Sequence, residues 1–148
     1  MTTPVIHSLV KALQGVTALG SLGEDTALRI VGVSANLLWP EGSLIFAADH
    51  PAEGLYIVLR GRVRVFEDNG GRDQDVAFMG PGDFFGEASL LLDTDHTKSA
   101  EAVEDSELMV VPRRSFHQLL ASDPELDRQV RATHYERVPG GSAPAVQR

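Results

Sequence analysis

Short β-prone runs separated by turn residues fill the middle of the sequence, and this pattern restricts the fold more than any other feature. Residues 55–59 (LYIVL) form a strongly β-prone run, which Gly61 interrupts. Residues 68–71 (DNGG) and 80–83 (GPGD) are typical of tight turns. Strands this short, with turns this frequent, predict an antiparallel barrel or jelly roll over residues 36–111.

The alternation of side chains predicts which of them face the interior of this roll. Val63 and Val65 alternate with arginines, the period of two expected for a half-buried strand. We therefore expect four apolar side chains to point into the roll: Leu55, Ile57, Val63 and Val65. Arg60, Arg62 and Arg64 would then lie on the outer face, either solvated or in contact with an acidic partner.

Helices are predicted on both sides of the roll. Apolar residues recur at helical spacing in the N-terminal segment, residues 5–33, and again in residues 113–138. Ser122 or Asp123 would cap the last helix, with Pro124 in its first turn. The 148 residues fit one domain, which we place at residues 1–138, with a disordered tail at residues 139–148.

Several function classes lack support in the composition. The formal net charge is −8 and lysine occurs twice, so nucleic-acid binding is not expected. No apolar run is long enough for a membrane span and no secretory pattern is present, so we expect a cytoplasmic protein with no membrane partner. The histidines lack metal-ligand spacing, and no nucleophile motif is present. We therefore expect no metal site, no catalytic residue and no enzymatic activity.

Three segments, taken in their order along the chain, resemble the motifs of a known family. Residues 54–63 (GLYIVLRGRV), 80–91 (GPGDFFGEASLL) and 104–108 (EDSEL) resemble the motifs of cyclic nucleotide-binding domains of the catabolite activator type. The resemblance covers about residues 19–137. It implies a mainly β fold, a double-stranded β-helix or β-roll with flanking helices, and a regulatory rather than catalytic role.

The resemblance also implies a binding site for cyclic AMP or cyclic GMP. Glu87 matches the acid that accepts a hydrogen bond from the ribose 2′-hydroxyl, and Gly86 permits close approach of the ligand. A short helix after Gly86 would aim backbone N–H groups at an anion. Tyr135 on the last helix either covers the base or merely packs. The complete set of expected ligand contacts is Gly86, Glu87, Ala88, Ser89, His96, Thr97, Lys98, Ser99, Val63, Val65 and Tyr135.

The sequence departs from the family where an arginine should meet the cyclic phosphate. A gapless match puts His96 at that position, with Thr97 at the small hydroxyl position. A register shifted by two puts Lys98, Ser99 and Ala100 there instead. We prefer the gapless match, and the shifted one stays open.

Both residues also have ordinary interpretations: His96 as a solvated residue at the tip of a loop, and Lys98 as a surface cation. Acids far outnumber lysine between residues 83 and 107, which disfavours the binding of a phosphate group.

Two functions from different classes are consistent with these observations. The first is a sensor that binds a cyclic nucleotide or a related nucleotide-like anion and signals through its last helix to a protein partner. The second is a degenerate, ligand-free module for homodimerisation or protein interaction. We favour the first, because Gly86, Glu87 and a hydroxyl at Thr97 or Ser99 are present. About ten residues remain after residue 138, too few for a DNA-reading helical domain.

Overall fold

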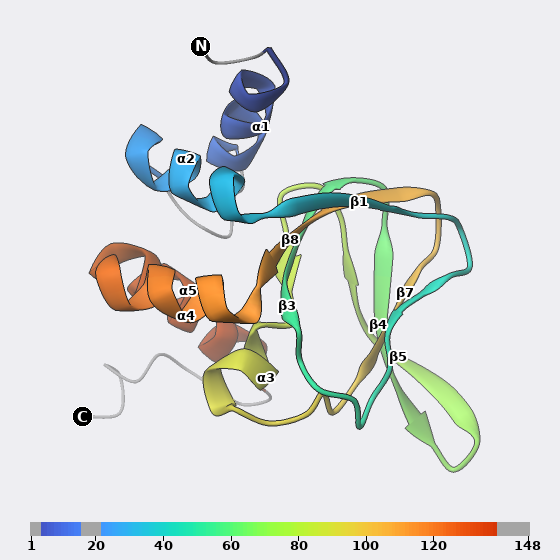
Figure 1. Cartoon of the computed structure of the whole chain (residues 1–148). Helices are drawn as coiled ribbons and strands as arrows, with labels where there is room; N and C mark the ends of the chain where they lie inside the picture. The colour runs from blue at the N-terminus through green and yellow to red at the C-terminus, as the bar shows by residue number, and fades with distance from the viewer. Residues whose placement is uncertain (1–3, 16–21, 139–148) are drawn as a thin grey trace.

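The structure is a computed structural model that describes residues 4–15 and 22–138. Two four-stranded antiparallel sheets form the roll, and the helices lie together at one side of it (Figure 1). The first sheet has the order β1-β8-β3-β6 and the second β2-β7-β4-β5. This arrangement confirms the predicted mainly β fold with flanking helices. The expected tail at residues 139–148 lies outside the described residues.

The elements have the following bounds. The strands are β1 Ala35–Trp39, β2 Leu44–Phe46, β3 Gly54–Arg60, β4 Val63–Asn69, β5 Arg72–Met79, β6 Phe84–Phe85, β7 Ser99–Ala102 and β8 Ser106–Pro112. The helices are α1 Pro4–Gln14, α2 Glu24–Val33, α3 Glu87–Leu92, α4 Arg113–Ser122 and α5 Pro124–Arg137.

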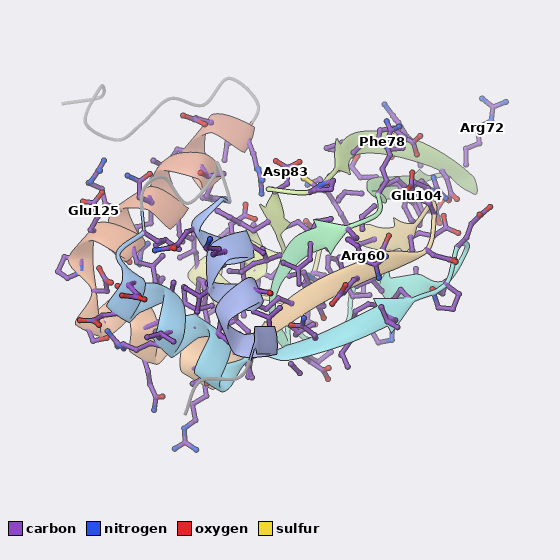
Figure 2. The ribbon with its side chains drawn as sticks, turned by 90° about the horizontal axis from the view of Figure 1, so that it is seen from above. Arg60, Arg72, Phe78, Asp83, Glu104 and Glu125 are labelled. Carbon is purple, nitrogen blue, oxygen red and sulfur yellow. The ribbon has the colours of Figure 1, made fainter. Side chains whose placement is uncertain are left out.

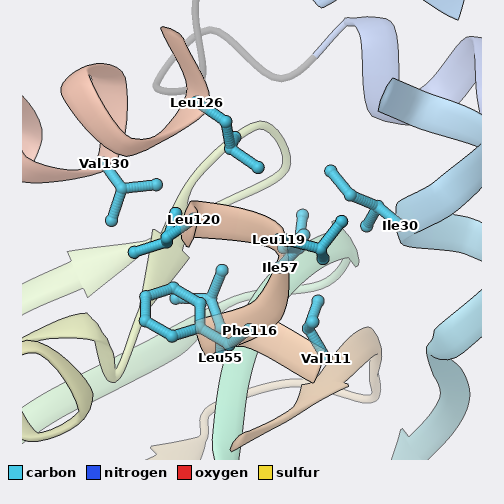
Figure 3. Close-up of a pocket in the computed structure, with 9 residues that line it drawn as sticks. All are labelled: Ile30, Leu55, Ile57, Val111, Phe116, Leu119, Leu120, Leu126 and Val130. Carbon is cyan, nitrogen blue, oxygen red and sulfur yellow. The ribbon is translucent and has the colours of Figure 1, made fainter. Parts of the chain in front are cut away.

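Strand β3 is buried on both faces, which corrects one prediction. Val63 and Val65 do face the roll interior, where they pack with Tyr56 and Val58 of β3. Leu55 and Ile57 instead face the opposite side of the sheet and pack against the helices, as Figure 3 shows. Our expectation that all four apolar side chains share the interior was therefore wrong for this strand. Helices cover the outer face of β3, so the side chains on both of its faces are apolar. The sequence of this strand therefore lacks the alternation that would identify the face inside the roll.

The core beneath the helices is closely packed. Nine apolar side chains surround a void of about 10 Å³ there (Figure 3). A buried water needs several polar partners, and this lining supplies only aliphatic and aromatic groups. The void is therefore a dry packing gap and not a binding site.

The start of α5 has the predicted cap. The side chain of Asp123 accepts a hydrogen bond from the backbone N–H of Leu126 at 3.1 Å, and Pro124 is in the first turn. Thr26 of α2 donates to the other oxygen of Asp123 at 2.6 Å. These hydrogen bonds, first that of Thr26, lower the pKa of Asp123. One carboxylate thus both begins α5 and ties it to the N-terminal helices.

The three arginines of the β3–β4 hairpin are engaged within the chain. Arg60 pairs with Glu107 at 2.9 Å, and the guanidinium of Arg62 lies 4.4 Å from the ring centroid of Phe78. Arg64 bridges neighbouring strands by binding Glu101 of β7 and Asp75 of β5, both at 2.7 Å. The β4–β5 hairpin extends beyond the rest of the roll, and Arg72 at its tip points away from the molecule (Figure 2).

Candidate functional site

A cavity lies between the roll, α3 and the end of α5. Its volume is about 550 Å³, within the range of small-molecule sites. Aromatic and aliphatic side chains of β2, β4, β5 and β6 form one wall, and α3 with the loop before β7 forms another. The lining residues are Phe46, Val65, Val76, Ala77, Phe78, Met79, Asp83, Phe85, Gly86, Glu87, Ala88, Ser89, His96, Thr97, Lys98, His134, Arg137 and Val138.

Gly86 makes the sharp turn from β6 into α3. Its φ is +88°, a backbone conformation that side chains bearing a Cβ rarely adopt. A Cβ at this position would lie 3.2 Å from Cδ1 of Tyr56, closer than ordinary van der Waals contact. Glycine therefore lets α3 begin directly against β3 and brings Glu87 to the mouth of the cavity.

Glu87 is a buried carboxylate with two basic partners on α5. Its side chain lines the cavity, although the residue is only 4% exposed. Nη1 of Arg137 lies 2.9 Å from Oε1, and Nδ1 of His134 lies 3.4 Å from Oε2. Burial raises the pKa of Glu87, but the His134 hydrogen bond and the charge of Arg137 outweigh it, so the pKa is lowered overall. Glu87 is thus ionised and holds the end of α5 over the cavity.

His96 is buried, which corrects the interpretation of it as a solvated loop-tip residue. It is 3% exposed, and its ring stacks on Phe46 with centroids 3.7 Å apart and planes inclined by 6°. Backbone hydrogen bonds to Asp49 and His50 fix its loop, because His96 accepts from Asp49 and donates to the carbonyl of His50. Burial lowers the pKa of His96, although Asp95 and Glu53 oppose this effect. The ring is therefore neutral at neutral pH.

The two nitrogens of His96 differ in their surroundings. Nδ1 lies 3.2 Å from the hydroxyl of Ser89 on α3. Nε2 is buried and has no hydrogen-bond partner among the described residues. A buried polar atom without a partner is rare in folded proteins, and here it belongs to a residue that lines a cavity.

The remaining expected contacts divide into those at the cavity and those away from it. Thr97 is exposed on the lining, and Lys98 also lines the cavity, with Nζ 3.8 Å from Glu67 of β4. The hydroxyl of Ser99 accepts from the backbone of Ala48 at 2.9 Å, away from the lining. The lining set contains Ala88, Ser89 and Val65. It does not contain Val63, which is buried behind it, or Tyr135.

Helix α5 reaches the cavity through residues that the sequence analysis did not select. His134 and Arg137, three positions apart and so on one helix face, line the cavity, whereas Tyr135 contacts the ring of His134 with centroids 5.5 Å apart. The family resemblance suggested Tyr135, because aromatic or apolar residues at that place cover the base in the family. The sequence signal for His134 and Arg137 is weaker, since it consists of two basic residues on one face of the helix.

Within residues 4–15 and 22–138, no cluster of three or more histidine or acidic side chains could hold a metal ion. No helix in that part of the chain is both long enough and apolar enough to cross a membrane.

Comparison with known proteins decides the family. The sequence profile described as the cyclic nucleotide-binding domain matches residues 37–123, more than half of the chain. The chain belongs to this family. Its fold is the β-roll of cyclic nucleotide-binding domains of the catabolite activator type, as the resemblance implied.

Three relatives illustrate the match. The cyclic AMP receptor protein of Thermus thermophilus is 40% identical over 84 residues, 56% of this chain and 39% of that protein. The crystal structure of the Thermus thermophilus catabolite activator protein matches with a TM-score of 0.76 and 31% identity, over 83% of this chain and 58% of that one. Lysophospholipase NTE1 of Chaetomium globosum is 32% identical over 82% of this chain and 8% of its own length. The chain thus spans less than two thirds of the length of each relative.

Proposed function

We propose that this cyclic nucleotide-binding domain is a ligand-controlled regulatory module. A cyclic nucleotide, or a related nucleotide-like molecule, would bind in the cavity between the roll and α5. The observation that carries the proposal is the position of Glu87, a buried carboxylate on the cavity wall that is held by Arg137 and His134 of α5.

The ligand would compete with α5 for this carboxylate. If Glu87 accepts a hydrogen bond from a ribose hydroxyl, as the family suggests, its contacts with Arg137 and His134 must weaken. The first half of α5 is anchored by Leu126 and Val130 in the core, so its last turn is the part free to respond. Ligand binding would therefore shift the population of docked and released ends of the helix.

The output would pass to another protein. The elements that the structure describes all belong to the roll and its flanking helices. We propose that a protein partner or a second copy of the domain reads the position of α5. We take residues 1–138 as the regulatory unit and assign it no catalytic step.

Calorimetric titration with cyclic AMP, cyclic GMP, adenosine and guanosine tests the proposal. We expect at least one of the four compounds to bind. We expect Glu87→Ala to abolish or strongly weaken that binding, since a hydrogen bond to a charged group is worth about 1.5–3 kcal/mol. Arg137→Gln should tighten binding about three- to tenfold, because the ligand no longer displaces the guanidinium.

Arg131→Gln is the matched control. It removes the same charge from the same helix, but Arg131 pairs with Asp127 at 2.9 Å and lies away from the cavity lining. This variant should bind like the wild type. If none of the four compounds binds, the sensor proposal is wrong and the ligand-free interaction module becomes the better explanation. Weaker binding by Arg137→Gln would contradict the competition between ligand and helix.

A further inference from the structure

The charges around the cavity are already neutralised within the chain. Among the described lining residues, the permanent cations are Lys98 and Arg137. Lys98 faces Glu67 at 3.8 Å and Arg137 faces Glu87 at 2.9 Å. A phosphate group entering this cavity would have to take a cation away from a carboxylate, while losing its own hydration.

The position where the family has its phosphate-binding arginine offers a different kind of contact. In the gapless register that position is His96, which burial keeps neutral. Its ring is fixed between Phe46 and the hydroxyl of Ser89. When Ser89 donates to Nδ1, Nε2 carries the hydrogen and is a donor without a partner among the described residues. A neutral donor of this kind suits a hydroxyl or carbonyl oxygen better than a phosphate.

The rest of the lining suits a flat, uncharged ring bearing hydroxyl groups. Phe46 and Phe85 supply aromatic surface, whereas the ring of Phe78 lies on the opposite face of β5, under the guanidinium of Arg62. Glu87 supplies an ionised acceptor for a pair of hydroxyls. Aromatic walls with few polar groups are typical of sites for heterocyclic ligands.

We propose that this cavity selects an uncharged nucleoside over a cyclic nucleotide, with the unpartnered Nε2 of His96 as the hydrogen-bonding group in place of the phosphate-binding arginine. This inference rests on the proposed function, because it narrows the ligand of the same site. Selectivity arises at the position of the missing arginine, where Lys98 is engaged by Glu67 and the imidazole of His96 is neutral.

The titration of the wild-type protein tests this directly and needs no variant. We expect adenosine or guanosine to bind at least about tenfold more tightly than the corresponding cyclic nucleotide, a difference of about 1.4 kcal/mol. Equal or tighter binding of the cyclic nucleotide would overturn this inference and leave the sensor function standing. Absence of binding by all four compounds would overturn both.

Substitution of His96 identifies the residue responsible. His96→Arg should shift the ratio of nucleoside to cyclic-nucleotide affinity towards the cyclic nucleotide at least about tenfold, because a guanidinium can bind two phosphate oxygens. The control is His50→Arg, which adds the same charge at an exposed position of the adjacent loop and should leave the ratio unchanged.

A second variant guards against misfolding of the arginine variant. His96→Phe keeps an aromatic ring on Phe46 but removes both nitrogens, and it should weaken nucleoside binding at least about fivefold. Thermal unfolding of each variant shows whether it is folded. A folded His96→Phe protein with unchanged nucleoside affinity would exclude His96 as the contact.

Discussion

Glu87 is stabilised in its charged form by α5, so the stability of the domain should depend on pH through this residue. Because its pKa in the folded state lies below the ordinary value of 4.5, the carboxylate stabilises the fold above about pH 4.5. That contribution is lost as the pH falls through the lowered pKa. Glu87→Gln should therefore reduce the free energy of unfolding by about 2 kcal/mol at neutral pH.

The difference between wild type and Glu87→Gln should shrink in acid, because a protonated carboxyl resembles an amide. Urea unfolding of both proteins at about pH 7 and about pH 3 measures this difference directly. Glu136→Gln is the control, since Glu136 is an exposed carboxylate on α5 and its removal should change stability little at either pH. A difference that is independent of pH would contradict the lowered pKa.

At the scale of single residues, the sequence predicted part of the cavity lining. Gly86 and Glu87 belong to a local motif whose geometry depends on adjacent residues, and both line the cavity. The partners of Glu87 could not be predicted in the same way, because Arg137 is 50 positions away and meets it only when α5 docks. The burial of His96 likewise depends on the distant Phe46, so nothing in its own loop indicated it.

At the scale of elements, the β3–β4 hairpin depends on Gly61. Its φ is +98°, and a Cβ there would lie 2.2 Å from the hydroxyl oxygen of Ser106 and 2.7 Å from the carbonyl oxygen of Asp105. The backbone of β8 cannot move away without losing its pairing with β3. Gly61→Ala should lower the free energy of unfolding by about 3 kcal/mol or more in a denaturant titration.

Gly70→Ala separates crowding from backbone strain. Gly70 also has a positive φ, +67°, but no atom lies within 4 Å of its would-be Cβ. This variant should lose only about 1 kcal/mol, the cost of the backbone conformation alone. Equal losses in the two variants would show that contact with Ser106 contributes nothing.

The sequence was most informative about elements with one exposed face and least about elements covered on both. The turns, the hairpin at residues 68–71 and the cap of α5 follow from local residue chemistry, and the structure has them where predicted. In β3, Leu55, Tyr56, Ile57 and Val58 are all buried, so the pattern contains no information about which face meets the helices. That choice is made by packing between distant segments.

For the whole molecule, two cores share one sheet. The cluster inside the roll contains Val58, Val63 and Phe85, and the cluster under the helices contains Ile57, Leu126 and Val130. Strand β3 contributes to both, so the roll and the first half of α5 form one packed body. The last turn of α5 instead reaches the cavity through His134 and Arg137, which places the expected response at the end of the helix.

The net charge of the whole chain leads to a prediction about DNA. The formal net charge is −8, and Arg60, Arg64 and Lys98 are each paired with an acid of the same domain. Binding to duplex DNA requires cations that can replace the counterions of the phosphates, and such cations are scarce on this surface. We expect this chain not to bind a labelled duplex in fluorescence anisotropy at about 150 mM salt. Lowering the salt to about 20 mM should not produce binding either.

A basic DNA-binding protein on the same probe is the control, and it should bind more tightly as the salt is lowered. Sub-micromolar, salt-dependent binding by this chain would contradict the prediction and would require a basic surface that the pairing of its arginines does not indicate.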